Sequence, residues 1–134
     1  MTTQARATGT FTIDTWEAQP YDEHDGITLS RTRVTKTFSG EIEGQSTAEL
    51  LMAQAQEGSA AYVGMECIEA RVHGRSGSFV LHHSATAARG AQSASWTVVP
   101  DSGTGDLCGL RGEARIANTP DGGHTFILDY DLGD

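Results

Sequence analysis

Cysteine is scarce in this chain of 134 residues, in which only Cys67 and Cys108 occur. The two lie far apart and lack the paired spacing of a zinc or redox motif, so neither kind of site is indicated. We expect both to be small side chains of the core.

Long apolar runs are missing as well. The longest stretches span a few residues, far short of the ~20 that a membrane helix requires, and the polar segment 1–6 has no apolar signal-peptide core. These absences predict a cytoplasmic protein without a membrane partner.

Basic residues are few, with 9 against 18 acidic ones and a formal net charge of −9 at pH 7. A field of this sign repels polyanions and offers no basic stripe to a phosphate backbone, so nucleic acid is not expected as a partner. The basic residues are eight arginines and one lysine, Lys36, a bias to which we assign no mechanistic meaning.

Several motifs of catalysis and ligand binding are absent. The pattern G-x-S-x-G of covalent hydrolases does not occur, and Asp106 rather than a lysine follows Gly103 and Gly105, which disfavours a phosphate loop. His82 and His83 are adjacent, so in a strand they point to opposite faces and cannot chelate one ion. No three potential ligands show metal-site spacing, and we expect neither a metal nor another cofactor.

What the chain does contain is a series of short runs rich in Thr, Val, Ile, Phe and Ser, separated by turns with Gly, Asp and Pro. This pattern is typical of an all-β sandwich or barrel, and the length suits one domain over residues 1–134. Glycine in the turns accepts positive φ, which favours antiparallel hairpins between successive strands. We expect eight strands at Ala7–Trp16, Thr28–Phe38, Ile42–Met52, Ala60–Val72, Gly77–Thr86, Ser93–Val99, Gly112–Asn118 and His124–Leu132.

The segment Ser46–Glu49 conflicts with this pattern because it fits a helix capping box. The apolar residues that follow it also have helical spacing. A helix here, however, would leave one strand too few to close an eight-stranded barrel. We therefore expect a strand across 47–52 and a closed antiparallel barrel of eight strands.

Six stretches extend in a specific order over nearly the whole chain: Thr35–Gly40, Gly74–Leu81, Trp96–Pro100, Ser102–Gly105, Leu110–Glu113 and Leu128–Leu132. Together they resemble a bacterial family known as domain of unknown function 3224. The fold of that family is similar to the closed eight-stranded barrel of allene oxide cyclase, which agrees with the strand count reached from the residues. The resemblance implies an architecture, in which the glycine bend at Gly103–Gly105 is structural, but it implies no catalytic role.

Alternation along barrel strands separates inward from outward side chains. Glu66 shares a face with Tyr62 and Ile68 in the middle of a long apolar strand. Burial without a partner would raise the pKa of this carboxyl group and suit Glu66 for acid–base catalysis. An equal alternative is a structural glutamate that ties strands together through an arginine. The candidate arginines are Arg33, Arg75 and Arg111.

His83 shares a face with Phe79 and Leu81, opposite His82. Two roles stay open for His83, as a catalytic partner of Glu66 or as a hydrogen-bonded wall residue. His82 is expected to be a surface imidazole.

Four aromatic residues are candidates to line a site for a small hydrophobic molecule, although core packing explains them equally well: Tyr62, Phe79, Trp96 and Tyr130. The first functional hypothesis is a cofactor-free isomerase, cyclase or epoxide-opening enzyme in which Glu66 and His83 exchange protons. The alternatives are a non-catalytic protein that binds a hydrophobic metabolite and a packed barrel that acts through its outer surface. Apolar residues on both strand faces also predict a homo-oligomer, with a dimer as the first expectation.

Overall fold

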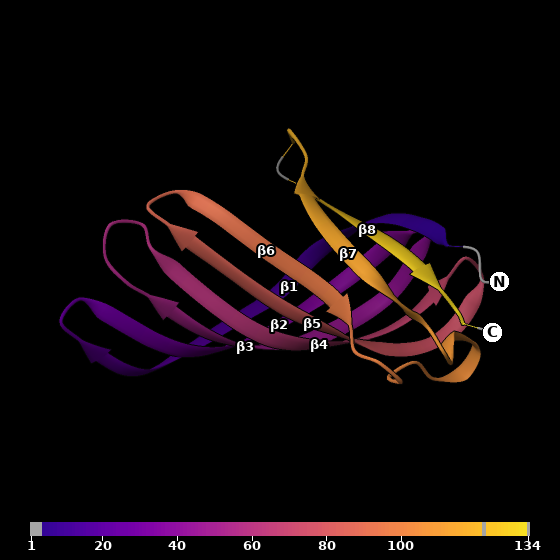
Figure 1. Ribbon diagram of the computed structural model, residues 1–134, viewed down its shortest axis with the longest axis horizontal. Helices are drawn as coiled ribbons and strands as arrows, with labels where there is room; N and C mark the ends of the chain where they lie inside the picture. Colours follow the sequence, from indigo (N-terminus) through magenta and orange to yellow (C-terminus); the bar gives the residue numbers. More distant parts are fainter. Residues whose placement is uncertain (1–3, 122, 134) are drawn as a thin grey trace.

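The protein is described by a computed structural model for residues 4–121 and 123–133. Its strands form one closed barrel in which each strand is antiparallel to the next and the last pairs with the first (Figure 1). The elements are β1 (Ala5–His24), β2 (Ile27–Gly40), β3 (Ile42–Gln54), β4 (Ala60–Val72), β5 (Arg75–Ala88), β6 (Ala91–Val98), the short 3-10 helix η1 (Gly105–Leu107), β7 (Arg111–Asn118) and β8 (His124–Asp131). The closed eight-stranded antiparallel barrel is therefore confirmed, whereas its likeness to allene oxide cyclase stays a prediction. None of the helical residues in the described part forms a helix long and apolar enough to cross a membrane.

Tight turns with two consecutive positive φ angles join several of the strands. This geometry matches the right-handed twist of the flanking strands, and glycine adopts it without steric cost. The turn pairs are Asp25 and Gly26, Glu57 and Gly58, His73 and Gly74, and Arg89 and Gly90. The turns therefore set the antiparallel course that the sequence predicts.

The segment with helical spacing lies inside β3 and is a strand, as expected from barrel closure. Ala48 in its middle pairs with Val34 of β2 on one side and with Glu66 of β4 on the other. Pairing on both edges outweighs the local preference for a helix.

The first strand is longer than predicted. We expected it to end at Trp16, but β1 continues to His24 in register with β2. Beyond Phe11 it has no second neighbouring strand in the described part of the chain, because its pairing with β8 covers only residues 5–11. Pro20, which has no N–H to donate, is tolerated on such a free edge. The pairing with β2 also shifts register twice, between Ile13 and Thr15 and between Pro20 and Asp22.

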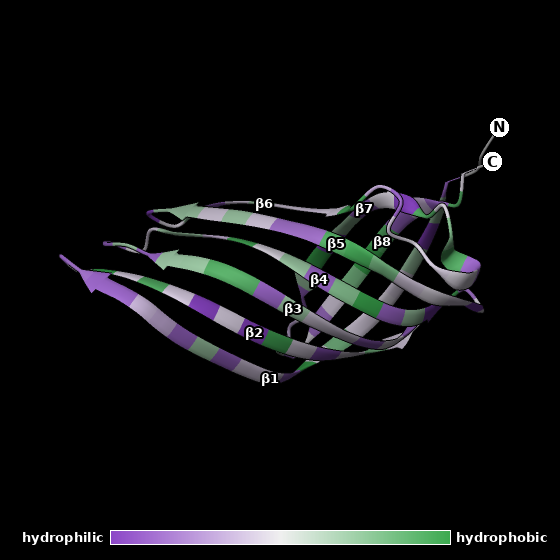
Figure 2. Ribbon diagram, turned by 90° about the horizontal axis from the view of Figure 1, so that it is seen from below, coloured by the Kyte–Doolittle hydropathy of each residue, from purple (hydrophilic) through white to green (hydrophobic). Residues whose placement is uncertain are grey.

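The barrel is closed over only part of its length. Besides the short contact between β1 and β8, β6 pairs with β7 only at Trp96 and Thr97. The hairpins β1–β2, β3–β4 and β5–β6 extend well beyond β7 and β8, toward the left in Figure 1 and in Figure 2. The molecule therefore has a closed half and an open half, and we call the inner face of the open half the trough.

Apolar side chains fill the closed half. Phe11, Phe38 and Phe126 pack with tilted and edge-on rings whose centroids lie 5.3–6.5 Å apart. Leu107 and Leu110, from the segment between β6 and β7, are fully buried in the same cluster. This segment therefore covers one end of the barrel.

The covering segment contacts β5 at very short range. A Cβ atom on Gly77 would lie 2.0 Å from the carbonyl oxygen of Thr104, and one on Gly103 would lie 2.0 Å from that of Leu107. Thr104 N donates to Ser78 O at 2.8 Å, and Thr104 Oγ1 accepts from Ser78 N at 3.0 Å. The glycines at this bend are therefore architectural, as expected.

Both cysteines are exposed, so the expectation that they belong to the core is wrong. Cys67 lies between the inward-facing Glu66 and Ile68, and strand alternation therefore turns it outward. Cys108 follows η1 on the outside of the covering segment.

Gly77→Ala should destabilise the barrel because its methyl group has no room against Thr104. We expect a loss of about 1–3 kcal/mol in the free energy of unfolding, as for other overpacked sites. Urea unfolding at neutral pH measures it, with Ser76→Ala at the exposed neighbouring position as the control. Equal stability of the two variants would contradict the close approach.

Candidate functional site

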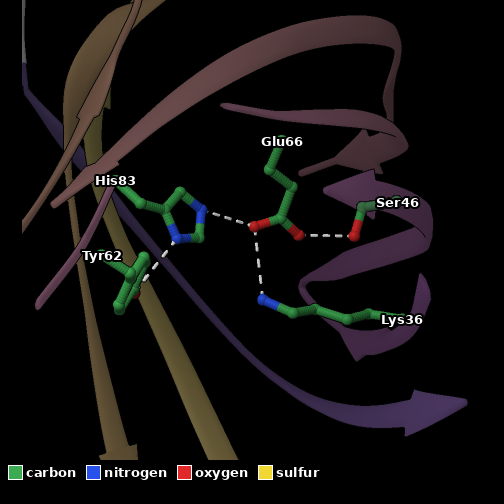
Figure 3. Close-up of polar contacts among 5 residues, drawn as sticks. All are labelled: Lys36, Ser46, Tyr62, Glu66 and His83. Atoms are coloured by element: carbon green, nitrogen blue, oxygen red, sulfur yellow. Dashed lines mark hydrogen bonds and ion pairs between the residues drawn. The ribbon is translucent and has the colours of Figure 1, made fainter. Parts of the chain in front are cut away.

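Four buried polar side chains lie where the packed core of the closed half meets the open half. Their relative exposures are 8% or less, and we call them the polar cluster: Lys36 on β2, Ser46 on β3, Glu66 on β4 and His83 on β5 (Figure 3). Glu66 and His83 therefore face the interior, and His82 is exposed.

Strand alternation explains why these residues point inward. Lys36 lies between the buried Val34 and Phe38 on one face of β2, as Glu66 shares its face with Ile68 on β4. The residue opposite His83 is Gly64, where a Cβ atom would lie 2.3 Å from Leu50 Cδ2. The missing side chain at Gly64 thus leaves room for Leu50 beside the cluster.

The carboxylate of Glu66 is the centre of the polar cluster. Its Oε1 accepts a hydrogen bond from His83 Nε2 at 2.7 Å and contacts Lys36 Nζ at 3.3 Å. Its Oε2 accepts a hydrogen bond from Ser46 Oγ at 2.5 Å. Both oxygens of a carboxylate with 0% exposure therefore have partners from other strands.

The ionised form of Glu66 is favoured. Burial raises the pKa of the carboxyl group, but the hydrogen bond from His83, the charge of Lys36 and the hydrogen bond from Ser46 outweigh it and lower the pKa to about 2. The condition for a raised pKa, burial without a partner, is therefore not met.

The alternative of a glutamate paired with a cation from another strand is met, but the cation is not one of the three candidate arginines. The cation beside Glu66 is Lys36, at 3.3 Å. Two of the candidate arginines form ion pairs elsewhere, Arg33 with Glu49 at 3.8 Å and Arg111 with Asp131 at 2.6 Å. The third candidate, Arg75, is exposed on β5.

The contact with Glu66 defines which nitrogen of His83 accepts a proton. A carboxylate only accepts hydrogen bonds, so Nε2 carries a hydrogen, and in the neutral form of the ring the lone pair is at Nδ1. Nδ1 lies 3.5 Å from the hydroxyl of Tyr62 (Figure 3). This carboxylate–imidazole arrangement is the one that orients a general base.

Tyr62 and Trp96 lie next to this nitrogen. Burial raises the pKa of the Tyr62 hydroxyl, the nearby Trp96 opposes the rise, and the negative charge of Glu66 adds to it. Trp96 Nε1 is buried and makes no hydrogen bond of acceptable distance and angle with any described residue. Its ring centroid lies 6.3 Å from that of His83.

A cavity of about 220 Å³ opens above the polar cluster into the trough. Tyr62, Trp96 and His83 line it, together with Lys36. Its other walls are mostly apolar and come from Phe11, Ile13, Trp16, Val34, Ala48, Leu50, Met52 and Ile116, with Asn118 and His124 at β7 and β8. A second hollow of about 350 Å³ along β3–β6 shares Met52, Tyr62 and Trp96 with it, so the space continues along the trough.

The other two aromatic candidates do not line this cavity. Phe79 is fully buried in the core cluster of the closed half. Tyr130 belongs to the same cluster, and its hydroxyl lies 2.5 Å from His73 Nδ1. The cavity therefore brings together Tyr62, Trp96 and His83 of the residues expected at the site.

Lys36 is the site residue that the sequence analysis missed. The signal was present in the alternation of Val34, Lys36 and Phe38, which puts the lysine on the core face of its strand. Its proximity to Glu66 depends on the registers of β2, β3 and β4, which are set by the whole barrel.

Glu66→Gln should destabilise the protein, because it leaves the ammonium of Lys36 buried without its counter-ion. We expect a loss of about 3–5 kcal/mol in the free energy of unfolding at neutral pH, with Glu69→Gln on the outer face of β4 as the control. The lowered pKa adds a pH dependence. The advantage of the wild type over Glu66→Gln is fully present above the unfolded-state pKa, near 4.5, and is lost as the pH falls toward about 2.

Urea unfolding at a series of acidic pH values measures this difference. An unchanged or raised stability of Glu66→Gln would contradict the ion pair and would indicate that the carboxylate is held at a cost in stability. A difference that stays constant down to the lowest pH would contradict the lowered pKa.

Comparisons with known proteins give a family but no activity. The family model described as protein of unknown function DUF3224 matches residues 7–130. A solved structure of a protein with unknown function from the same family, from Shewanella oneidensis MR-1, is 34% identical, with a TM-score of 0.83 over 96% of this chain and 97% of that one. Among curated proteins no match is found. The chain therefore belongs to the DUF3224 family.

Proposed function

We propose that the open half of the barrel binds a small, mostly apolar molecule above the polar cluster. The observation that carries this proposal is the cavity of about 220 Å³, which has apolar walls and a polar floor. Ligand sites of proteins commonly combine an apolar lining with a few polar groups that orient the ligand.

The floor and the walls have different roles in this proposal. Ile13, Trp16 and Leu50 bury the apolar part of the ligand, and their contribution grows with the apolar area removed from water. Lys36, Tyr62 and His83 present hydrogen-bonding groups at the bottom and fix the orientation of a polar group of the ligand.

A cofactor-free isomerase, cyclase or epoxide-opening enzyme is the second candidate. It is supported by the lone pair of His83 Nδ1, because Nε2 is engaged by the ionised Glu66 at 2.7 Å. In this reading His83 is the base and Glu66 orients it, which replaces the expected exchange of protons between the two residues. A binding protein without catalysis uses the same cavity and lacks only the proton transfer.

Binding can be measured with the neutral apolar fluorophore N-phenyl-1-naphthylamine. The chain has two tryptophans, Trp16 and Trp96, and both line the cavity, so energy transfer from them reports a bound probe. Ile116→Phe should weaken binding by about tenfold, because it fills part of the cavity.

Ala117→Phe is the matched control, since this neighbouring residue of β7 is exposed and does not line the cavity. Binding should be the same in Ala117→Phe and in the wild type. Equal affinity in Ile116→Phe, or no energy transfer in the wild type, would refute the proposed site.

Catalysis can be tested with 2-acetylnaphthalene in D₂O. A base at His83 should exchange the hydrogens next to the carbonyl group, and His83→Gln should slow that exchange by about 100-fold. Proton NMR follows the loss of the methyl signal, and fluorophore binding verifies that the variant keeps its cavity. If the exchange rates of wild type and His83→Gln are equal, the barrel binds without acting as a base.

A dimer and a cytoplasmic location, both expected from the sequence, stay predictions. Leu51, Val63 and Met65 on the outer faces of β3 and β4 are 51–53% exposed, and this apolar surface suits the dimer.

A further inference from the structure

The basic residues of this chain divide sharply by position. All eight arginines are exposed, whereas Lys36, the only lysine, is 8% exposed. Every basic residue on the surface is therefore an arginine, and the one lysine lies at the floor of the cavity.

The two side chains differ in what they can do chemically. An arginine remains protonated under all ordinary conditions, so its guanidinium is a charge and a hydrogen-bond donor but no nucleophile. A lysine can lose a proton and attack a carbonyl carbon, and lysines that form imines act in this way. A buried counter-ion for Glu66 alone does not require this property.

The amine of Lys36 lies where a bound molecule would meet it. Lys36 lines the cavity, with Nζ 3.3 Å from Glu66 Oε1 and 4.7 Å from the ring centroid of Phe11. His83, which bonds the same carboxylate oxygen, lines the cavity as well. An amine, a carboxylate and an imidazole therefore lie together beneath an apolar space.

We infer that Lys36 forms an imine with a small, mostly apolar aldehyde or ketone bound in this cavity. The inference rests on the proposed function, because it names the chemical class of the ligand for the same site. The apolar walls hold the hydrocarbon part, and the carbonyl group points to the floor.

The reaction balances within the site. The ammonium of Lys36 gives one proton to His83 Nδ1, and the amine nitrogen then forms a bond to the carbonyl carbon while the π electron pair of the carbonyl group moves to its oxygen. A proton passes from this nitrogen to this oxygen. The carbon–oxygen bond of the resulting carbinolamine breaks, and the oxygen leaves as water with the proton that His83 returns. One ammonium and one carbonyl compound thus give one protonated imine and one water molecule.

Glu66 favours this product. The positive charge is on the nitrogen of Lys36 before and after the reaction, and in between it moves only to His83, which bonds the same carboxylate oxygen, so Glu66 pairs with the ammonium at the start and with the iminium at the end. No net charge is moved into or out of the interior, which avoids the cost of an unpaired buried ion. The water molecule leaves through the open half of the barrel.

The test uses 2-naphthaldehyde and sodium cyanoborohydride with the full chain at neutral pH. Reduction traps an imine as a stable amine, which peptide mapping by mass spectrometry locates. The chain offers two kinds of amine, Lys36 and the terminal α-amino group. The α-amino group, with a pKa of about 8 against about 10.4 for a free lysine, would react first without a binding site.

We expect the opposite order, with Lys36 modified about tenfold faster than the α-amino group because the cavity concentrates and orients the aldehyde. Lys36→Arg keeps the positive charge and should abolish the adduct inside the barrel. Ile116→Phe should slow the modification of Lys36, and Ala117→Phe should leave it at the rate of the wild type.

The hydrocarbon 2-methylnaphthalene separates the two proposals, since it has the same ring and no carbonyl group. Displacement of N-phenyl-1-naphthylamine by this hydrocarbon shows that the cavity binds. If it binds but the aldehyde modifies only the α-amino group, Lys36 is a structural counter-ion and the imine is refuted. If neither the hydrocarbon nor the fluorophore binds, the proposed function fails, and modification of Lys36 no faster than the α-amino group then refutes the imine as well.

Discussion

Burial of an ionised carboxylate costs free energy, and the buried Glu66 therefore requires partners from the surrounding strands. Removing such an ion from water costs several kcal/mol unless partners replace the lost hydration. Lys36, Ser46 and His83 supply these partners, and each comes from a different strand. A shift of any one strand by one residue would turn its partner outward, because side chains alternate across the barrel wall. The ion pair and its hydrogen bonds therefore help to specify the register of β2 to β5.

The same interactions prepare the site. Because Glu66 is ionised, His83 holds its hydrogen on the nitrogen that faces the carboxylate and presents the other nitrogen to Tyr62. Lys36 is kept beside the carboxylate at the boundary between the packed and the open half. A structural role and a chemical role for these groups are thus compatible, since one charge both stabilises the fold and orients the neighbouring side chains.

The sequence predicts which strand face a side chain occupies, but it does not predict the position of that side chain along the barrel axis. Alternation alone put Glu66 beside Ile68 on the core face of its strand, and the structure confirms this burial. The lowering of its pKa depends on the hydrogen bond from His83 and on the charge of Lys36. Lys36 lies 30 residues away in the chain and comes near only through two strand pairings. The sequence also does not predict that Phe79 lies in the packed core while Tyr62 lies at the cavity, because both side chains point inward. Position along the barrel axis follows from strand tilt and from where β7 and β8 end, and no local pattern encodes either.

The long free edge of β1 has a consequence for the behaviour of the molecule among its copies. Unpaired backbone groups along a strand are a template on which a strand of another molecule can add, and repeated addition leads to fibres. Pro20 interrupts this edge, and the two register shifts of β1 twist it out of line. The barrel can therefore leave one side of its trough open while this edge remains a poor template for a further strand.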